Sequence, residues 1–367
     1  MLSRGNLGAP VVMGLPALAR TTPRRVVDTT LSGSPEAAAD LEQPALQTRT
    51  GIVSWWRALK DAYCISRIIY PTEGNRRHAK RVRFFLRALY NFSTWQHWYG
   101  FLRGSPFGAI ARYYPRLYEK PFRPYLHKDL TSTECHRVLR EHYLFLQRHA
   151  PDGLVRAILD NRPFILNQNS LADMSEPLIV NFTYGKHMQQ EGELTLSIGR
   201  PESVGSFKEH EWIASLTFVI QYGASGWEIL IGGVQGGRTL KSKEDAKLAT
   251  RVFHGMRPKH YLIYILREVA ATWGITRIYA IGNDAHCFRR RRYQDRLSLI
   301  KASYDDLWQD VGGQAAANGF YSLPVENNRR PIHTVPSRKR AQYLRRFAML
   351  EHIDREIRDK LTPKHDS

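Results

Sequence analysis

The sequence is poor in cysteine. Its 367 residues include three, Cys64, Cys135 and Cys287, and no two of them form a CxxC pair. An odd number of scattered cysteines argues against a disulfide framework and against a structural zinc site. We therefore expect no metal site and a reducing compartment.

Long apolar runs are also missing. No stretch reaches the ~18 apolar residues that suggest a membrane-spanning helix, so we expect no transmembrane segment. The apolar run over 9–19 faintly resembles the hydrophobic part of a signal peptide, but Pro10, Gly14 and Pro16 interrupt it. We expect a cytoplasmic protein.

Acidic residues are few beside basic ones. The chain has 54 Lys and Arg against 34 Asp and Glu, a formal net charge of +20. This excess favours anionic partners, which include nucleic acid, an anionic membrane surface and a phosphate-bearing small molecule. No motif that reads nucleic acid accompanies the charge, so a nucleic-acid partner ranks last. The competing interpretation is a basic surface that lies in water and binds nothing specific.

The motifs of several enzyme classes are absent. HExxH, GxSxG, Walker A, EF-hand and zinc-ribbon patterns do not occur. Their absence argues against a metalloprotease, an α/β-hydrolase and a P-loop nucleotide hydrolase.

The chain divides into four predicted regions. Residues 1–50 mix Pro, Gly, Ser, Thr and Ala without a period, which predicts a flexible leader. A helical, aromatic-rich region is expected over 51–170, an α/β core over 171–335 and a basic C-terminal helix over 336–367.

The helix predicted over 76–92 places Phe84, Phe85 and Leu86 among arginines and lysines. Such a helix can lie on a membrane surface or on a phosphate backbone. We favour the other interpretation, in which its apolar face packs on the protein body and its arginines lie in water.

The core is predicted to begin with antiparallel strands over 178–184, 192–198, 213–222 and 227–234, the last two joined as a hairpin. Alternation of apolar and polar residues within 192–198 is typical of an antiparallel strand. Glu191 and Glu193 alternate here and would share one face. They are candidates for paired carboxylates, although we favour a merely polar sheet face.

Residues 227–283 organise the rest of the chain. They contain a strand, a glycine turn, helical residues 243–273 with a break at Pro258, and a second strand over 276–282. Strands separated by helices of this length predict a β–α–β crossover. The predicted fold class is therefore α+β, with a mixed, mainly antiparallel sheet and flanking helices.

The glycine turn is the first candidate site. It consists of Gln235, Gly236, Gly237 and Arg238, and Lys241 follows it closely. Glycines let backbone N–H groups converge on phosphate oxygens, and the following helix adds its positive N-terminus. The pattern predicts a phosphate cradle. The alternative is a crossover turn without a ligand.

A second basic corner lies at the helix break, where His254, Arg257 and Lys259 cluster around Pro258. Three cationic groups at one corner could bind a carboxylate or a phosphate. The alternative is that they only complement the ends of the two helices, since Pro258 suits the first turn of a helix.

Candidate acid–base groups follow the second strand. Open α/β sheets place ligands at the carboxyl ends of strands, where Asp284 and His286 lie. His286 would act as a base if Asp284 orients it, whereas the arginines that follow indicate an exposed loop. Tyr304 and Trp308 share one face of a later helix, so we expect both to pack inward.

Several ordered motifs resemble the VirK/YbjX family of Gram-negative bacteria. They are EGEL at 191–194, IGGVQGG at 231–237, HGMRPK at 254–259, YDDLW at 304–308, GFYSLP at 319–324 and SRKRAQYLRR at 337–346. The resemblance extends over about 59–353 and leaves out the leader. It implies a bacterial, virulence-related and accessory role linked to the cell envelope, peripheral to the inner membrane, and it names no reaction.

The order of elements in the C-terminal half also resembles the GNAT acetyltransferases. That resemblance implies an acyl-CoA whose pyrophosphate lies at the glycine turn, and a role for Tyr304 as proton donor to the leaving thiol. The turn departs from the GNAT pattern, which usually reads Gln/Arg-x-x-Gly-x-Gly/Ala. No cofactor is certain on this basis. The function that the VirK/YbjX resemblance implies is virulence-related and of unassigned biochemistry, with acyl-CoA-dependent acyl transfer as the preferred mechanism. The alternative is a non-enzymatic envelope protein that binds anionic lipid or a protein partner through basic helices at 76–92 and 337–358.

Overall fold

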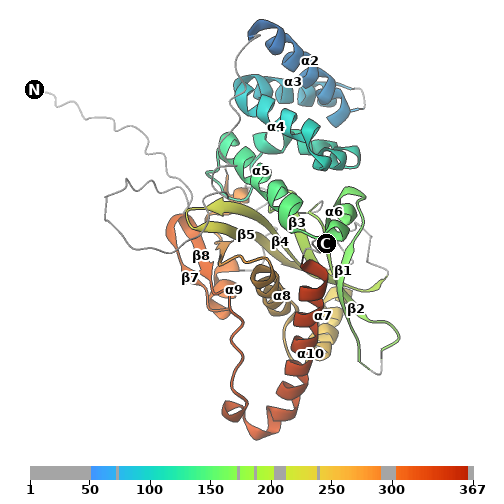
Figure 1. The fold of residues 1–367 in the computed structure, drawn as a ribbon, viewed down its shortest axis with the longest axis vertical. Helices are drawn as coiled ribbons and strands as arrows, with labels where there is room; N and C mark the ends of the chain where they lie inside the picture. The colour runs from blue at the N-terminus through green and yellow to red at the C-terminus, as the bar shows by residue number, and fades with distance from the viewer. Residues whose placement is uncertain are drawn as a thin grey trace, which may run out of the picture.

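A computed structural model describes residues 51–71, 74–171, 174–185, 188–201, 212–237, 240–290 and 303–362. The predicted leader at 1–50 lies outside these residues. The described part of the chain folds around one sheet with helices on both sides (Figure 1), which is the predicted α+β class.

The sheet has eight strands in the order β1-β2-β3-β4-β5-β6-β8-β7. All neighbouring pairs are antiparallel except β5 and β6, which run parallel. The bounds are β1 Phe164–Asn169, β2 Leu178–Tyr184, β3 Leu194–Gly199, β4 Trp212–Gly223, β5 Gly226–Gly236, β6 Arg277–Ile281, β7 Gln314–Ala315 and β8 Phe320–Leu323. β1 and β7 were not predicted, since neither segment has a marked apolar alternation.

The helices fall into two groups along the chain. Before the sheet come α2 Gly51–Ile69, α3 Asn75–Tyr90, α4 Phe92–Gly104, η2 Pro106–Arg112, η3 Pro115–Phe122, α5 Ser132–His149 and α6 Asp152–Leu159. Within and after the sheet come α7 Leu240–Val252, α8 Pro258–Thr272, η5 Cys287–Arg289, α9 Tyr304–Asp310, η7 Ala317–Gly319, η8 Ile332–Thr334 and α10 Ser337–Leu361. The break at Pro258 is confirmed, because Pro258 is the first residue of α8.

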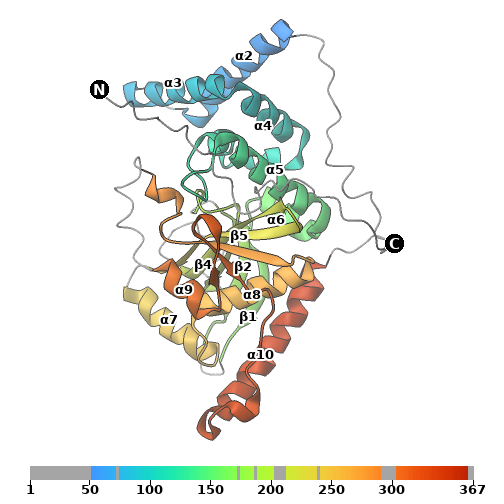
Figure 2. The ribbon, with the colours of Figure 1, turned by 90° about the vertical axis from the view of Figure 1, so that its left-hand side faces the viewer.

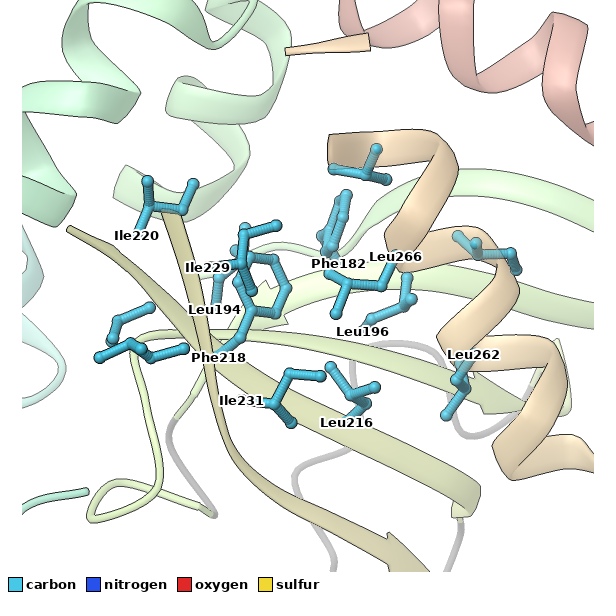
Figure 3. Close-up of a cluster of buried hydrophobic side chains, with 14 of the residues drawn as sticks. Phe182, Leu194, Leu196, Leu216, Phe218, Ile220, Ile229, Ile231, Leu262 and Leu266 are labelled. Atoms are coloured by element: carbon cyan, nitrogen blue, oxygen red, sulfur yellow. The ribbon is translucent and has the colours of Figure 1, made fainter. Parts of the chain in front are cut away.

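The main core lies between the sheet and α8 (Figure 3). Phe182, Leu196 and Leu216 point from three adjacent strands toward Leu262 and Leu266 of the helix, and none of the five is exposed by more than a trace. Burying a side chain of this size stabilises the fold by about 1.5–3 kcal/mol. The sheet is therefore fixed in position by its apolar face.

Helix α5 caps the part of β4 that extends past β3. The β3–β4 register ends at Leu194 and Phe218, so the next residues of β4 have no strand partner on that side. The N–H of Ile220 donates to His142 Nδ1 at 3.1 Å, and the N–H of Tyr222 donates to Glu141 Oε2 at 3.0 Å. Two side chains of α5 thus satisfy backbone donors of β4, of which that of Ile220 is buried.

Helices α2, α3 and α4 form a separate layer at the end of the molecule away from α10 (Figures 1 and 2). They have a small core of their own, which includes Ile65 and Ile69 of α2, Phe84 and Ala88 of α3, and Trp95 of α4. Phe84 of the helix predicted at 76–92 is therefore packed on neighbouring helices, whereas Leu86 is exposed.

The parallel pair β5–β6 is short. Its register runs from Glu228 opposite Arg277 to Ile231 opposite Ala280, but β5 continues beside β4 to Gly236. A β-bulge falls at the same point, because Phe218 pairs with Ile231 while Thr217 pairs with Gly233. The two parallel strands therefore part at Gly232, next to the glycine turn.

Candidate functional site

Two fully buried carboxylates stand on either side of Gly192, just before β3. The exposed fraction is 2% for Glu191 and 1% for Glu193. β3 begins only at Leu194, so these residues are not part of a strand with a shared polar face, and that prediction is wrong. A Cβ on Gly192 would lie 2.7 Å from the carbonyl oxygen of Phe218, which shows how closely the loop approaches β4.

The Glu193 carboxylate forms an ion pair with one cation and accepts hydrogen bonds from two hydroxyls. Lys120 of η3 forms an ion pair with it. The hydroxyl of Tyr125 donates to Oε1 at 2.7 Å, and that of Tyr143 donates to Oε2 at 2.5 Å. Burial lowers the pKa of Lys120 against the attraction of Glu193. A buried charge is tolerated only when it is paired and hydrogen-bonded, so the contacts of this cluster must stay intact in the folded protein. Through these contacts the cluster joins η3 and α5 to the start of β3.

The Glu191 carboxylate has different partners. The side-chain Nε2 of Gln235 donates to Oε2 at 3.2 Å, and Nε2 of His286 lies 3.4 Å from Oε1. Nδ1 of His286 accepts the N–H of Phe288 at 3.3 Å, so this nitrogen has no proton. The ring proton then lies on Nε2, which is close to Glu191 but makes no hydrogen bond with it. The two side chains form a buried carboxylate–imidazole pair.

Two glycines of β5 make room for Glu191. A Cβ on Gly232 would overlap the carbonyl group of Glu191, and a Cβ on Gly233 would overlap its carboxylate. Both glycines lie where β5 leaves β6. The sequence prediction placed the importance of the IGGVQGG motif in its second glycine pair and missed the first. Two adjacent glycines inside a strand were the available indication, because such glycines mark bulges and close approaches.

Of the predicted acid–base residues, His286 and Tyr304 are buried and Asp284 is exposed. His286 is fully buried, whereas the Asp284 side chain is 90% exposed and lies 3.5 Å from Arg289. Asp284 therefore does not orient His286, and the carboxylate beside the imidazole is that of Glu191. Tyr304 is buried as predicted, with its ring centroid 5.8 Å from that of His286 and 6.0 Å from that of Trp308. The catalytic roles of His286 and Tyr304 stay predictions.

The glycine turn follows directly from the Glu191 site. Gln235 and Gly236 end β5, and the N–H of Gly237 donates to the carbonyl of Ile213 at 3.1 Å. That N–H group is thus already used within the protein. Arg238 lies outside the described residues, as does the side chain of Lys241.

The second basic corner is split up by the structure. His254 and Gly255 adopt positive φ values of 48° and 86° at the end of α7, and Arg257 is exposed at the start of α8. The carbonyl oxygen of His254 accepts two bonds from Arg346 of α10, at 2.6 and 3.0 Å. Burial lowers the pKa of His254, and Arg345 and Arg346 lower it further. This side of the corner is therefore a junction between helices.

Lys259 runs instead toward the glycine turn. Its Cε lies 3.7 Å from the position that a Cβ on Gly236 would occupy. The side chain is half-buried, burial lowers its pKa, and its ammonium has no hydrogen-bond or ion-pair partner among the described residues. One of the three corner residues thus joins the end of β5.

The arrangement places the Lys259 ammonium, which has no partner in the described part of the chain, beside Gly236, and the Glu191–His286 pair beside Gln235 and Gly233. The ammonium can neutralise an anionic group, and the carboxylate–imidazole pair can accept a proton. No group of three or more His, Cys, Asp and Glu side chains in the described ranges could hold a metal ion.

Comparison with known proteins places the chain among relatives from Gram-negative bacteria. The family model described as "Protein of unknown function (DUF535)" matches residues 73–359. The "Uncharacterized protein YbjX" of Escherichia coli (strain K12) is 28% identical over 77% of this chain and 83% of its own length. The "Membrane protein LapB" of Mannheimia haemolytica is 24% identical over 64% of this chain and 94% of its own length.

These matches confirm the resemblance to the VirK/YbjX proteins. No solved structure matches the chain significantly. None of the helices in the described residues is both long and apolar enough to cross a membrane.

Proposed function

The chain belongs to the DUF535 family, and from that premise we propose that it binds an acyl thioester of coenzyme A at the end of β5 and transfers the acyl group. The observation that carries the proposal is the Lys259 ammonium, which has no partner among the residues that the structure describes and lies beside Gly236, where β5 has already parted from β6. Such a half-buried ammonium is available to pair with an anionic group of a ligand.

The proposal explains why β5 is longer than its parallel partner. Past Ile231 its edge away from β4 no longer pairs with β6, so an extended ligand with amide groups could lie along it as a strand would. The phosphate end of such a ligand would then meet Lys259 and the N-terminus of α7, where the helix dipole favours negative charge. This is the GNAT-type placement that the order of elements implied.

The Glu191 site would supply the acid–base chemistry. An acceptor amine or hydroxyl attacks the thioester carbonyl carbon, a C–N or C–O bond forms, and the C–S bond breaks. Glu191 takes the proton of the acceptor while Gln235 holds its carboxylate in place and His286 lies beside it. Tyr304 keeps the role that the resemblance implies, as donor of a proton to the leaving thiolate. Because Glu191 is 2% exposed, the residues that bury its side chain must move before the acyl group can reach it.

Calorimetry with acetyl-CoA and a long-chain acyl-CoA tests binding. We expect the Lys259→Ala variant to bind about tenfold more weakly, because one charge-assisted contact to phosphate is lost. Arg257→Ala is the matched control, since this neighbouring cation is exposed. Absence of heat, together with no thermal shift at saturating ligand, would contradict the proposal. Release of free thiol, abolished by Glu191→Gln while binding persists, would then test transfer.

The expected location is the cytoplasm, at the periphery of the inner membrane. The printed name of one relative, "Membrane protein LapB", supports a place at a membrane for this chain as well. A virulence-related role is part of the proposal, because the resemblance to the VirK/YbjX family implies one.

A further inference from the structure

Large exposed apolar side chains gather on the first two helices. Of the ten large hydrophobic residues that are exposed in the described chain, seven belong to α2 and α3. Tyr90 is 90% exposed, Trp56 64%, Leu86 57% and Tyr63 56%. Single exposed apolar residues are ordinary, but a concentration of this kind on two adjacent helices marks an interaction surface.

The spacing places these residues on one side of each helix. Val82, Leu86 and Tyr90 follow one another at intervals of four residues along α3, so they form a continuous stripe. Trp56 and Tyr63, seven residues apart, share a face of α2. We call these five residues the outer face.

The outer face is distinct from the face that packs. Ile65 and Ile69 of α2 and Phe84 and Ala88 of α3 fill the small core of the helical layer. Each helix therefore has two apolar sides, of which one is covered within the protein. A helix that is apolar on both sides needs a second cover.

The charges around the outer face identify the cover as anionic. Helix α3 contains arginines and lysines but no aspartate or glutamate, and its Arg76, Lys80 and Arg83 are exposed. Helix α2 adds Lys60 and Arg67, both exposed beside Trp56 and Tyr63. Aromatic side chains mixed with Lys and Arg are the composition of segments that lie in a lipid interface.

The position of the two helices fits a flat partner. They form the outermost layer of the described molecule, and the sheet, α8 and α10 lie on its other side (Figures 1 and 2). We propose that the outer face docks on a bilayer with anionic headgroups, with its apolar side chains at the acyl boundary and the cations of α3 on the headgroups. This deepens the proposed peripheral location and is independent of acyl transfer.

Helix α10 provides an internal comparison. It is also basic, with exposed Arg338, Lys339 and Arg340, but Leu344 is its one large apolar residue that is exposed. Leu344 is 56% exposed and Leu86 57%, so the two leucines differ in their neighbours and hardly in exposure. Charge alone would make α10 bind as well as α3, whereas insertion requires the stripe.

Vesicle flotation of the full chain tests the proposal. We expect the protein to float with vesicles of phosphatidylcholine mixed with phosphatidylglycerol at low salt, and to float poorly with phosphatidylcholine alone or at high salt. Leu86→Ser combined with Tyr90→Ser should weaken flotation by about tenfold or more, because buried apolar area sets interfacial binding. Leu344→Ser should leave it unchanged. Lys80→Glu with Arg83→Glu should weaken binding more than Arg338→Glu with Lys339→Glu.

Three outcomes would overturn the proposal. One is equal flotation with neutral and anionic vesicles. Another is equal loss from the α3 and α10 variants. The third is a lipid-free dimer, seen by light scattering, that Leu86→Ser with Tyr90→Ser converts to a monomer, since a second copy would then be the cover. Circular dichroism of each variant checks folding. Acyl-CoA calorimetry on the Leu86→Ser, Tyr90→Ser variant keeps this proposal separate from the proposed enzyme, because loss of vesicle binding should leave any CoA binding intact.

Discussion

The imidazole Nε2 of His286 lies 3.4 Å from Oε1 of Glu191, and neither side chain reaches solvent beyond a trace. The two residues are 95 positions apart in the chain, by the difference 286 − 191. They meet because Leu126 joins the two segments: its N–H donates to the carbonyl of Gln190 at 2.7 Å, and its carbonyl accepts the N–H of Cys287 at 2.9 Å. Gln235 completes the arrangement from the strand itself.

The first prediction concerns the polarity of this arrangement. Glu191 accepts from Gln235 and has the proton of His286 facing it, so Glu191→Gln must turn an NH₂ group toward one of the two donors. We expect a loss of about 1–3 kcal/mol in the free energy of unfolding, the penalty for a buried polar group without a partner. Urea denaturation measures it.

In the double variant Glu191→Gln with Gln235→Glu, position 191 supplies the donor and position 235 the acceptor. This is the reverse of the native arrangement. The double variant should recover part of the lost stability. If the two changes are simply additive, the side chains are not coupled and the proposed arrangement is incorrect.

Sequence patterns predicted the strands and helices around this site well but missed the pair itself. The hairpin at 223–226, the break at Pro258 and the inward packing of Tyr304 and Trp308 all follow from local rules, and each is confirmed. The capping box of α5, in which Thr131 and Glu134 exchange bonds, is likewise a local device that Ser, Thr and Glu near a helix start predict.

Partners of buried charges depend on tertiary contacts that no local pattern encodes. Asp284 is two residues from His286 and was the natural candidate to orient it, yet its side chain points into water. Glu191 was expected on a polar sheet face, because alternation alone cannot tell a buried carboxylate from an exposed one. Lys259 was grouped with His254 and Arg257 by proximity in sequence, and the direction of its side chain separates it from them.

The second prediction concerns Gly233, where a Cβ would overlap the Glu191 carboxylate. Gly233→Ala should lower the free energy of unfolding by about 1–3 kcal/mol through overpacking. Gly100→Ala in α4 is the control, because nothing lies within 4 Å of a Cβ there, and it should stabilise by about 0.5–1 kcal/mol. Glu191→Ala in the same chain as Gly233→Ala should reduce the penalty of the glycine change. An unchanged penalty would mean that the carboxylate is not the obstacle.

The third prediction is a pH dependence that comes from His142. Burial lowers the pKa of His142 to about 3, from an ordinary value of 6.5. Because the unfolded chain takes up this proton below pH 6.5 and the folded chain does not, the contribution to stability is complete above that value. It is lost as the pH falls from 6.5 toward 3, by about 1.4 kcal/mol for each pH unit.

His142→Asn keeps an acceptor near the position of Nδ1 for the N–H of Ile220 and removes the titrating group. We expect the variant to be less stable than the parent at pH 7 but to lose less stability between pH 6 and pH 4. Urea denaturation at several pH values gives both curves. Parallel curves would show that His142 does not contribute to the acid sensitivity.

The last prediction tests the Lys120–Glu193 cluster, which holds η3 and α5 to the sheet. Lys120→Met removes the cation and leaves a buried carboxylate with its two tyrosine donors. A buried charge without its counter-charge costs about 3–5 kcal/mol, so this variant should be strongly destabilised. Tyr143→Phe removes one hydroxyl donor and should cost about 1–3 kcal/mol. Tyr90→Phe, at a side chain that is 90% exposed, is the control and should change little.

Combining Lys120→Met with Glu193→Gln removes both charges, and we expect the double variant to be more stable than Lys120→Met alone. If it is less stable, the carboxylate is useful to the fold without its cation, and the hydroxyls of Tyr125 and Tyr143 are sufficient to hold it.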